Sequence, residues 1–304
     1  MWNMFKKERT ESEELRVLRA LNFRMDLKEK DKQYYANLLK GYEGEVMFDE
    51  YLRRLQIESL VLNDMLLELN HSHFQIDSLL ISQEYLHLFE VKNFEGEFYF
   101  EDGKFKMLNG TEVKNPLLQL NRNESLFRQL LNSYGVKIPI RTYLIFINPE
   151  FTLYQAPLDR RIIMPTNLNR TITQLNNEKS ALNLAHDRLS EKLLSSHIVK
   201  SPFSNVPQYE YSHLSKGVFC TNCGTVMEVY HGQNFTCKSC TTAENTRQAL
   251  IRQIQDYKIL FPHNKISTNV VYEWCGGVFP KKTIRHRLQE NFSVTGHGQW
   301  SYYE

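Results

Sequence analysis

The chain lacks a strong charge imbalance, a long apolar run and an internal repeat. Its 304 residues carry 37 Lys and Arg against 35 Asp and Glu, a formal net charge of +2. So small a charge argues against binding polyanions over the whole surface. No run approaches the ~20 apolar residues of a membrane-spanning helix, and the first residues, MWNMFKKERT, lack the apolar core of a secretory signal. We therefore expect a cytoplasmic protein without membrane contact.

Cysteine is scarce, and four of the five cysteines form two Cys-x-x-Cys pairs thirteen residues apart. In a chain without an export signal, this spacing indicates a metal site rather than disulfides. Four thiolates form a closed, structural Zn²⁺ site, and folding of so small a module is coupled to metal binding. We expect the intervening residues to form a hairpin that joins the two pairs. The predicted zinc ligands are Cys220, Cys223, Cys237 and Cys240.

The Cys-containing segment, about 215–243, resembles a zinc ribbon. Zinc ribbons contact nucleic acid, dock other proteins or act as spacers, and the sequence does not choose among these roles. Redox chemistry and unpaired thiols are the alternatives to zinc. His231 is expected to be a surface loop residue, and Cys275 a buried apolar thiol.

Hydrophobic periodicity predicts the order of helices and strands. Helices are expected over 11–22, about 28–55 and about 115–133, and strands over 58–69, 73–82, 85–93 and 141–148, with a hairpin at 98–108. A polar helical stretch follows at 160–200, and a proline-containing linker at 201–208. Gly41 and Gly44 lie inside the second helix, where glycine is unfavourable. Their presence predicts a break or a close approach of another backbone.

Acidic residues interrupt two of the apolar strands. In HLFEVKN, Glu90 and Lys92 lie two residues apart and therefore project from one face of the strand. Asp77 lies in the preceding strand, and Glu45 on the helix after Gly44. Converging carboxylates repel one another until a hard cation such as Mg²⁺ binds between them. Such a metal site is suited to phosphodiester hydrolysis. A solvated edge-strand pair, with Asp77 in a turn, is the alternative.

These residues resemble the nuclease-related domain (NERD) family of the restriction-endonuclease-like nucleases. The resemblance rests on Gly41-x-x-Gly44-Glu45, Ile76-Asp77, Phe89-Glu90-Val91-Lys92-Asn93 with Gly96, and Asn115-Pro116-x-x-Gln119. It implies that Asp77 and Glu90 bind Mg²⁺ or Mn²⁺ and that Lys92 is catalytic. Glu45 would be a further acidic ligand, and Gln119 would face the same site. Ile76 stands where the wider superfamily has proline.

The C-terminal residues suggest a helix-turn-helix with a short closing strand or wing at Trp300 and Tyr302. Gly276-Gly277 separates two helical patterns, and Pro280 is expected to begin the second. Such a second helix lies in the DNA major groove in helix-turn-helix proteins. A solvated helix face is the alternative. The predicted nucleic-acid contacts are Lys281, Lys282, Arg285 and Arg287, with His286 beside them.

The predicted fold is α/β: a restriction-endonuclease-like mixed sheet flanked by helices, a small zinc ribbon and a C-terminal winged-helix-like unit. The expected segments are an N-terminal helical extension (1–37), a nuclease-like domain (38–160), a connector (161–208), the ribbon (215–243) and a DNA-contacting unit (245–304). The predicted function is a metal-dependent nuclease that acts on DNA rather than RNA. A DNA-binding or scaffold protein that retains the fold without catalysis is the alternative.

Overall fold

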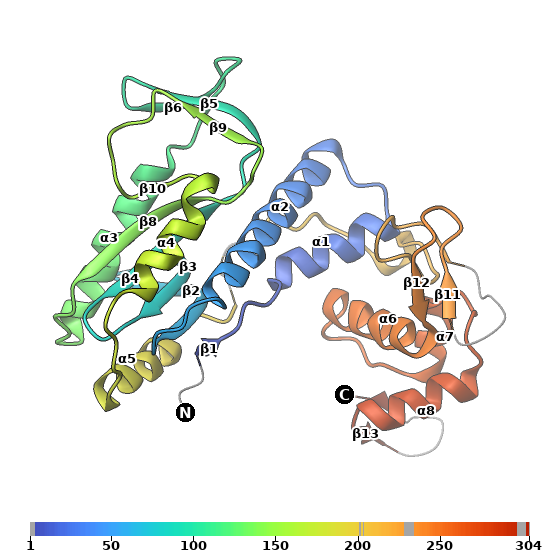
Figure 1. Ribbon diagram of the computed structural model, residues 1–304. Coiled ribbons are helices and arrows are strands. Elements are labelled where there is room, and N and C mark those ends of the chain that lie inside the picture. The colour runs from blue at the N-terminus through green and yellow to red at the C-terminus, as the bar shows by residue number, and fades with distance from the viewer. Residues whose placement is uncertain (1–3, 201, 203, 228–233, 297–301, 304) are drawn as a thin grey trace. The chain divides into compact units, whose positions relative to one another are not determined.

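The computed structural model describes all residues except 1–3, 201, 203, 228–233, 297–301 and 304 (Figure 1). Chain contacts divide it into two compact units. The first contains residues 1–10 and 37–202, and the second residues 11–36 and 203–304. The division falls inside the predicted linker and within a long helix, α2 (Glu29–Leu52). No described helix is both long and apolar enough to cross a bilayer.

The first unit is built on a six-stranded mixed sheet of order β1-β2-β3-β4-β8-β10. Strands β2, β3 and β4 are antiparallel neighbours, whereas β8 lies parallel to β4 and to β10, and β1 lies parallel to β2. The bounds are β1 (Phe5–Lys7), β2 (Leu60–Leu69), β3 (Ser72–Ile81), β4 (Leu86–Lys92), β8 (Ile140–Phe146) and β10 (Ile162–Ile163).

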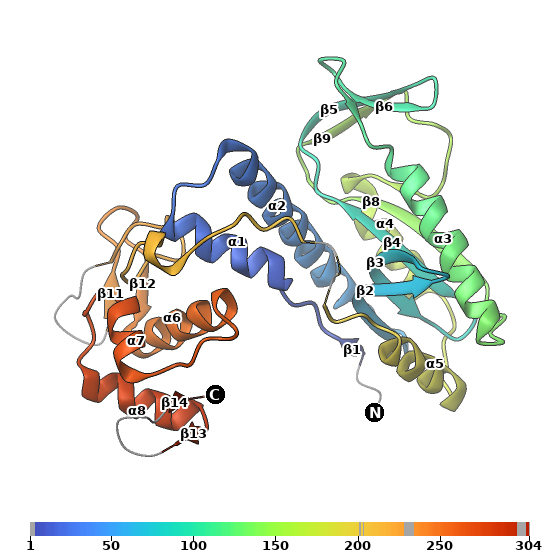
Figure 2. The ribbon, with the colours of Figure 1, turned by 180° about the vertical axis from the view of Figure 1, so that it is seen from behind.

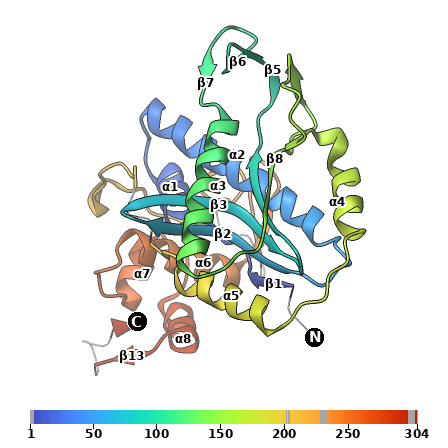
Figure 3. The ribbon, with the colours of Figure 1, turned by 90° about the vertical axis from the view of Figure 1, so that its left-hand side faces the viewer.

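Helices cover both faces of this sheet (Figure 3). Leu120 and Phe127 of α3 (Pro116–Ser133) pack on one face together with α5 (Leu184–Ser195). Phe48 and Leu52 of α2 pack on the other face together with α4 (Leu168–Asn176). The expected arrangement, a mixed sheet flanked by helices, is therefore confirmed.

A second, four-stranded sheet of order β7-β6-β5-β9 lies beyond the end of β4 (Figure 2). Asp102 and Gly103 both have positive φ, as a tight hairpin turn with matching twist requires, so the predicted hairpin is confirmed. Asn115 caps α3 and also donates to the Gly103 carbonyl at 2.9 Å. The strands are β5 (Gly96–Glu101), β6 (Lys104–Met107), β7 (Glu112–Val113) and β9 (Phe151–Tyr154).

The second unit packs the cysteine segment and the helices around one core. Trp274, Cys220 and Cys237 share it with Val17 and Leu21 of α1 (Glu13–Arg24). Its other elements are β11 (Asn234–Thr236), β12 (Ala243–Asn245), α6 (Thr246–Leu260), α7 (Thr268–Trp274), α8 (Lys281–Asn291), β13 (Val294–Thr295) and β14 (Tyr302–Tyr303). A 3₁₀ helix at Tyr211–His213 and the isolated β-bridges Phe219–Val226 and Ile266–Tyr303 complete the described elements of this unit.

Arg24 holds this core together although it is charged. Its guanidinium lies 3.5 Å from the centre of the Trp274 ring and donates to the Ser215 carbonyl at 2.7 Å. Burial lowers the pKa of Arg24 to about 10, which still leaves it protonated near neutral pH. The N-terminal helix is thus part of the core that contains the cysteines.

One local expectation needs correction, because Pro280 is the cap before α8 rather than its first residue. Helix α2 is continuous, so of the two outcomes expected at its glycines the break does not occur. Each Cys-x-x-Cys pair lies in its own turn, one between Phe219 and Val226 and the other between β11 and β12. Residues 228–233, which lie between the two pairs, are outside the described residues. His231 and Trp300 lie outside the described residues.

Candidate functional site

Strand pairing brings Asp77 and Glu90 to the same end of the sheet. The β3–β4 ladder ends at the pair Ser78–Phe89, and Asp77 and Glu90 come directly after it. Side chains alternate along a strand, so both continue the rows of Leu79 and Leu88, which belong to the core beneath α3. The Asp77 carboxylate then accepts from the Val91 amide at 2.7 Å, in place of a backbone partner. The two acids therefore share one face.

Glu90 lies in a network of amide and ammonium donors. It is 1% exposed, and its Oε1 accepts from the Lys92 ammonium at 2.7 Å and from the Gln119 amide. Its Oε2 accepts from Asn123 at 3.2 Å. Gln119 and Asn123 are one turn apart on α3 and therefore share a helix face. Asn123 was not predicted, although its place four residues after Gln119 is a usable signal.

A second network surrounds Glu45. Arg9, from the segment after β1, donates to the carboxylates of Glu45 and Asp49 and to the Asp77 carbonyl. Its side chain is 2% exposed. No local pattern identifies Arg9, because 36 residues separate it from Glu45. Glu45 is thus bound by a guanidinium, which sequence reasoning did not anticipate.

A close approach between α2 and Asn93, the residue after β4, brings these two networks together. A Cβ added to Gly44 would lie 2.4 Å from the Cβ of Asn93, whereas nothing lies within 4 Å of one added to Gly41. Asn93 donates to the Lys40 carbonyl at 2.8 Å and accepts from Asn148 at 3.0 Å. The close approach predicted for this helix therefore occurs at Gly44 and brings Glu45 near the end of β4.

The carboxylates at this end have raised pKa values. Burial and the charge of Asp77 raise the pKa of Glu90 to about 7, despite the opposing effect of Lys92. Burial likewise raises the pKa of Asp77, and burial and Asp77 raise that of Glu45. Burial alone would lower the pKa of Lys92, but Glu90 and Asp77 raise it by more. The site therefore concentrates negative charge away from water, a condition that a bound cation relieves.

The raised pKa of Glu90 makes stability depend on pH. The folded protein keeps a proton on Glu90 between the ordinary pKa of 4.5 and about 7, whereas the unfolded chain releases it. The folded state then binds more protons, so the free energy of unfolding falls as pH rises through this window.

The donor set at this end suits Mg²⁺. Asp77 and Glu90 provide two buried carboxylates, and Mg²⁺ in enzymes commonly takes one or two carboxylates together with water and substrate phosphate. Among the described residues, no donor is found for Asp77 Oδ1. Glu45, Asp77 and Glu90 do not form a group with ligand atoms all within 4.8 Å, within the part of the chain described.

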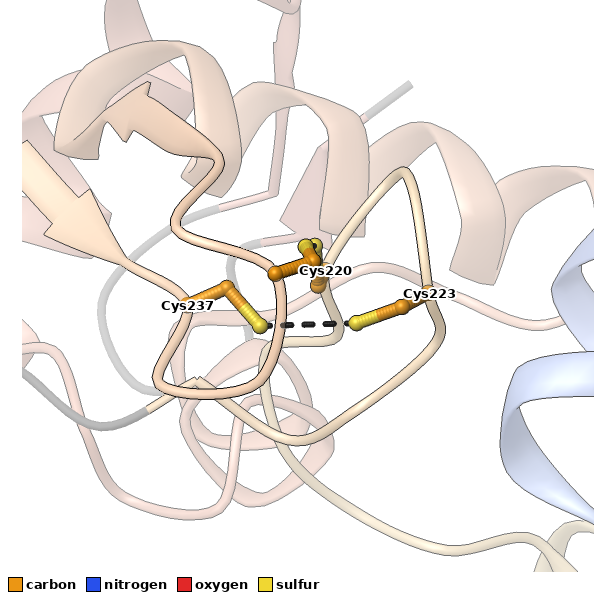
Figure 4. A group of neighbouring side chains, drawn as sticks. Cys220, Cys223 and Cys237 are labelled. Carbon is orange, nitrogen blue, oxygen red and sulfur yellow. Dashed lines mark hydrogen bonds between the residues drawn. The ribbon is translucent and has the colours of Figure 1, made fainter.

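The four predicted zinc ligands do gather. The ligand atoms of Cys220, Cys223, Cys237 and Cys240 all lie within 4.8 Å of one another. Figure 4 shows the sulfurs of Cys223 and Cys237 facing each other at 3.4 Å, and those of Cys220 and Cys240 are 3.5 Å apart. Tetrahedral Zn²⁺ with Zn–S bonds of ~2.3 Å separates its sulfurs by about 3.8 Å. This cluster is suited to a structural Zn²⁺.

The C-terminal helices are separated by the expected glycine turn. Gly276 and Gly277, both with positive φ, separate α7 from α8, and β13 pairs with β14 after α8. Tyr303 of β14 also bridges to Ile266 before α7. On α8, Ile284 and Leu288 are buried. Two helices, preceded by a bridging residue and followed by a short strand pair, thus follow α6 in this unit.

The predicted basic residues on α8 differ in availability. Lys281, Lys282 and Arg285 are exposed, and no salt bridge among the described residues involves them. Arg287 is half-buried and its guanidinium lies 2.5 Å from the Glu290 carboxylate, which also lies 3.2 Å from His286. The cations for which the described residues provide no salt bridge therefore lie toward the N-terminal half of α8, with Lys281 also 5.0 Å from the centre of the Tyr272 ring.

The first unit is an α/β domain in which buried carboxylates lie beside a lysine, at the point where the pairing of β3 with β4 ends. The family model of the nuclease-related domain, NERD, matches residues 40–147. The chain therefore contains a nuclease-related domain, as its sequence motifs indicated. No curated protein and no solved structure was found to match the chain. Arg9 lies outside the matched residues, whereas Asn123 lies within them.

Proposed function

We propose that this protein is a metal-dependent nuclease that hydrolyses phosphodiester bonds in DNA. The observation that carries the proposal is the Lys92 ammonium, 2.7 Å from the buried Glu90 carboxylate, on the strand face that also carries Asp77. A half-buried lysine kept charged by carboxylates is suited to bind a phosphate oxygen or to orient water. The match to a nuclease-related domain supports a phosphodiester substrate.

In this proposal Asp77 and Glu90 hold Mg²⁺ or Mn²⁺. When bound, the ion stabilises phosphoryl charge and lowers the pKa of an attacking water. Gln119 holds the side chains of Glu90 and Lys92 in place. Its amide donates to the Glu90 carboxylate, and its carbonyl oxygen accepts from the Lys92 ammonium at 3.3 Å. Asn123 fixes the second carboxylate oxygen. Glu45 is an additional acidic group near Asp77.

The second unit would deliver the nuclease to its substrate. Exposed Lys281, Lys282 and Arg285 on α8 provide cationic contacts for DNA phosphates, with an affinity that falls as salt rises. The zinc cluster would stabilise the core on which this helix packs. This assignment supports DNA over RNA, because a winged helix presents α8 to a major groove of B-form width.

The experiment is cleavage of single- and double-stranded DNA, and of RNA, with Mg²⁺ or Mn²⁺. We expect Lys92→Ala to lower the rate by about 10²–10⁴-fold while DNA binding persists. Lys106→Ala is the matched control, since Lys106 also lies 2.7 Å from a glutamate, Glu101, but on an exposed hairpin. Cleavage that survives both Lys92→Ala and Asp77→Ala would eliminate this site.

A non-catalytic DNA-binding protein is the second candidate. The observation that favours it is the order of α7, glycine turn, α8 and strand pair in the second unit, which would bind DNA without needing the carboxylates. DNA binding without cleavage under every metal tested would support it. Faster cleavage of RNA than of DNA would instead change the substrate and leave the site intact.

A further inference from the structure

Arg9 is a buried cation that connects α2 to β3, at the point where the pairing of β3 with β4 ends. It follows β1 in the chain, and its guanidinium uses all three nitrogens. Nε and Nη2 donate to the two oxygens of Asp49 at 2.9 and 3.0 Å. Nη1 donates to Glu45, and Nη2 also donates to the Asp77 carbonyl at 2.8 Å and to the Ser78 hydroxyl at 2.9 Å.

The pair with Asp49 fixes the plane of the guanidinium. Asp49 is 4% exposed and lies one helical turn after Glu45, so both project from the same side of α2. A bidentate arginine–carboxylate pair allows little rotation. With Asp49 held in this way, the remaining nitrogen of Arg9 can meet Glu45 in only one orientation. Arg9 therefore determines where the Glu45 carboxylate lies.

The same guanidinium also fixes the main chain of Asp77. The hydrogen bond from Arg9 to the Asp77 carbonyl holds Asp77 at the point in β3 where backbone pairing with β4 ends. The carboxylate of Asp77 is held from the other strand by the Val91 amide. Asp77 is thus fixed at its carbonyl by Arg9 and at its carboxylate by β4.

We propose that Arg9 is a positioning residue of the metal site, which orients Glu45 and Asp77 for cation binding without itself contacting the cation. This inference rests on the proposed nuclease site. It assigns a role in that site to the N-terminal segment, which lies outside the matched domain. Partners that orient metal ligands typically change metal affinity by ~10–100-fold when they are removed.

The test is Mn²⁺ binding to the full-length, zinc-loaded protein without nucleic acid, measured by calorimetry and by the electron paramagnetic resonance of free Mn²⁺. We expect Arg9→Gln to raise the Kd at least tenfold. Arg9→Lys should give an intermediate Kd, because lysine keeps the charge but not the fork. Arg53→Gln is the matched control: Arg53 pairs with Glu8 at 2.7 Å on the surface, and its loss should leave the Kd unchanged.

A double-mutant cycle with Glu45→Gln separates positioning from general stability. If Arg9 acts through Glu45, the double variant should bind Mn²⁺ about as weakly as either single variant. A loss of thermal stability with an unchanged Kd would indicate a merely structural role and overturn the inference. A tighter Kd would also overturn it, because Arg9 would then be a charge that competes with the metal.

Two outcomes distinguish this inference from the proposed function. If the wild type binds no Mn²⁺ beyond what an Asp77→Asn, Glu90→Gln variant binds, the metal site itself is wrong. If the wild type binds and Arg9→Gln binds equally well, only the role of Arg9 is wrong. Should Arg9→Gln fail to fold, Arg9→Lys and Asp49→Asn decide the question. Arg9→Lys keeps both charges of the pair without the fork, and Asp49→Asn keeps the guanidinium without its anionic partner, so each loses the fixed orientation.

Discussion

Replacing Gly44 by alanine tests the close approach of α2 to the end of β4. The new Cβ would lie 2.4 Å from the Asn93 Cβ, well inside the ~3.5–4.0 Å of favourable carbon contacts. The Asn93 Cβ is one bond from the main chain, so a side-chain rotation cannot relieve the overlap. Overpacking of this kind costs about 1–3 kcal/mol.

Two further contributions determine the net change in the free energy of unfolding on Gly44→Ala. Displacing Asn93 weakens its bonds to Lys40 and Asn148, each worth about 1 kcal/mol. Alanine, in contrast, stabilises the helix by about 1 kcal/mol relative to glycine because of its higher helix propensity. We therefore expect Gly44→Ala to lower the free energy of unfolding of the first unit by about 2 kcal/mol. The shift also moves the chain next to Lys92, so cleavage should fall as well.

Gly41→Ala is the matched control, because nothing lies within 4 Å of its added Cβ. It should stabilise the same helix by roughly 0.5–1 kcal/mol. Hydrogen exchange of the β4 amides as a function of urea reports unfolding of the first unit by itself. A Gly44→Ala protein as stable as Gly41→Ala would refute the packing argument.

Three other predictions follow from the site and the second unit. In buffer free of Mg²⁺ and Mn²⁺, the free energy of unfolding should fall as pH rises from 5 to 7, by about 1.4 kcal/mol for each pH unit by which the Glu90 pKa is raised. Urea melts of Glu90→Gln should show a free energy of unfolding that depends less on pH. Chelating zinc, or Cys237→Ser, should expose the buried Trp274 and shift its fluorescence to the red; an unchanged spectrum with zinc released would contradict the shared core. Lys281→Ala with Lys282→Ala should weaken DNA binding and reduce its dependence on salt by up to about two phosphate contacts; an unchanged slope in a binding titration would exclude α8.

Much of the local structure could be predicted because short-range signals specify it. Asn115-Pro116 predicts the start of α3, where Asn115 accepts from the Leu117 amide. Asp102-Gly103 predicts the hairpin turn. Apolar runs at 73–82 and 85–93, separated by turn-forming residues, predict the strands that carry the two acids. These signals need only neighbouring residues, so a single sequence contains them.

The errors and omissions share a different physical cause. The sequence left open whether Gly41 and Gly44 mark a break or a close approach, and the packing of Gly44 against Asn93 decides for the close approach within a continuous helix. Sequence reasoning missed Arg9 and Asn123, which lie far along the chain from the carboxylates that they bind. It also did not anticipate that α1 shares a core with the C-terminal helices.

By itself, the sequence determined the kinds of elements, the four clustered thiols and the acids and lysine of the candidate site, because side-chain periodicity and ligand spacing are local properties. The tertiary structure alone decided which distant segments meet. It brought Arg9 to Glu45 and Asp77, laid Asn123 beside Glu90, and paired β4 with β8. Such contacts depend on how buried faces pack together, and that is set by the whole core rather than by any short stretch of chain.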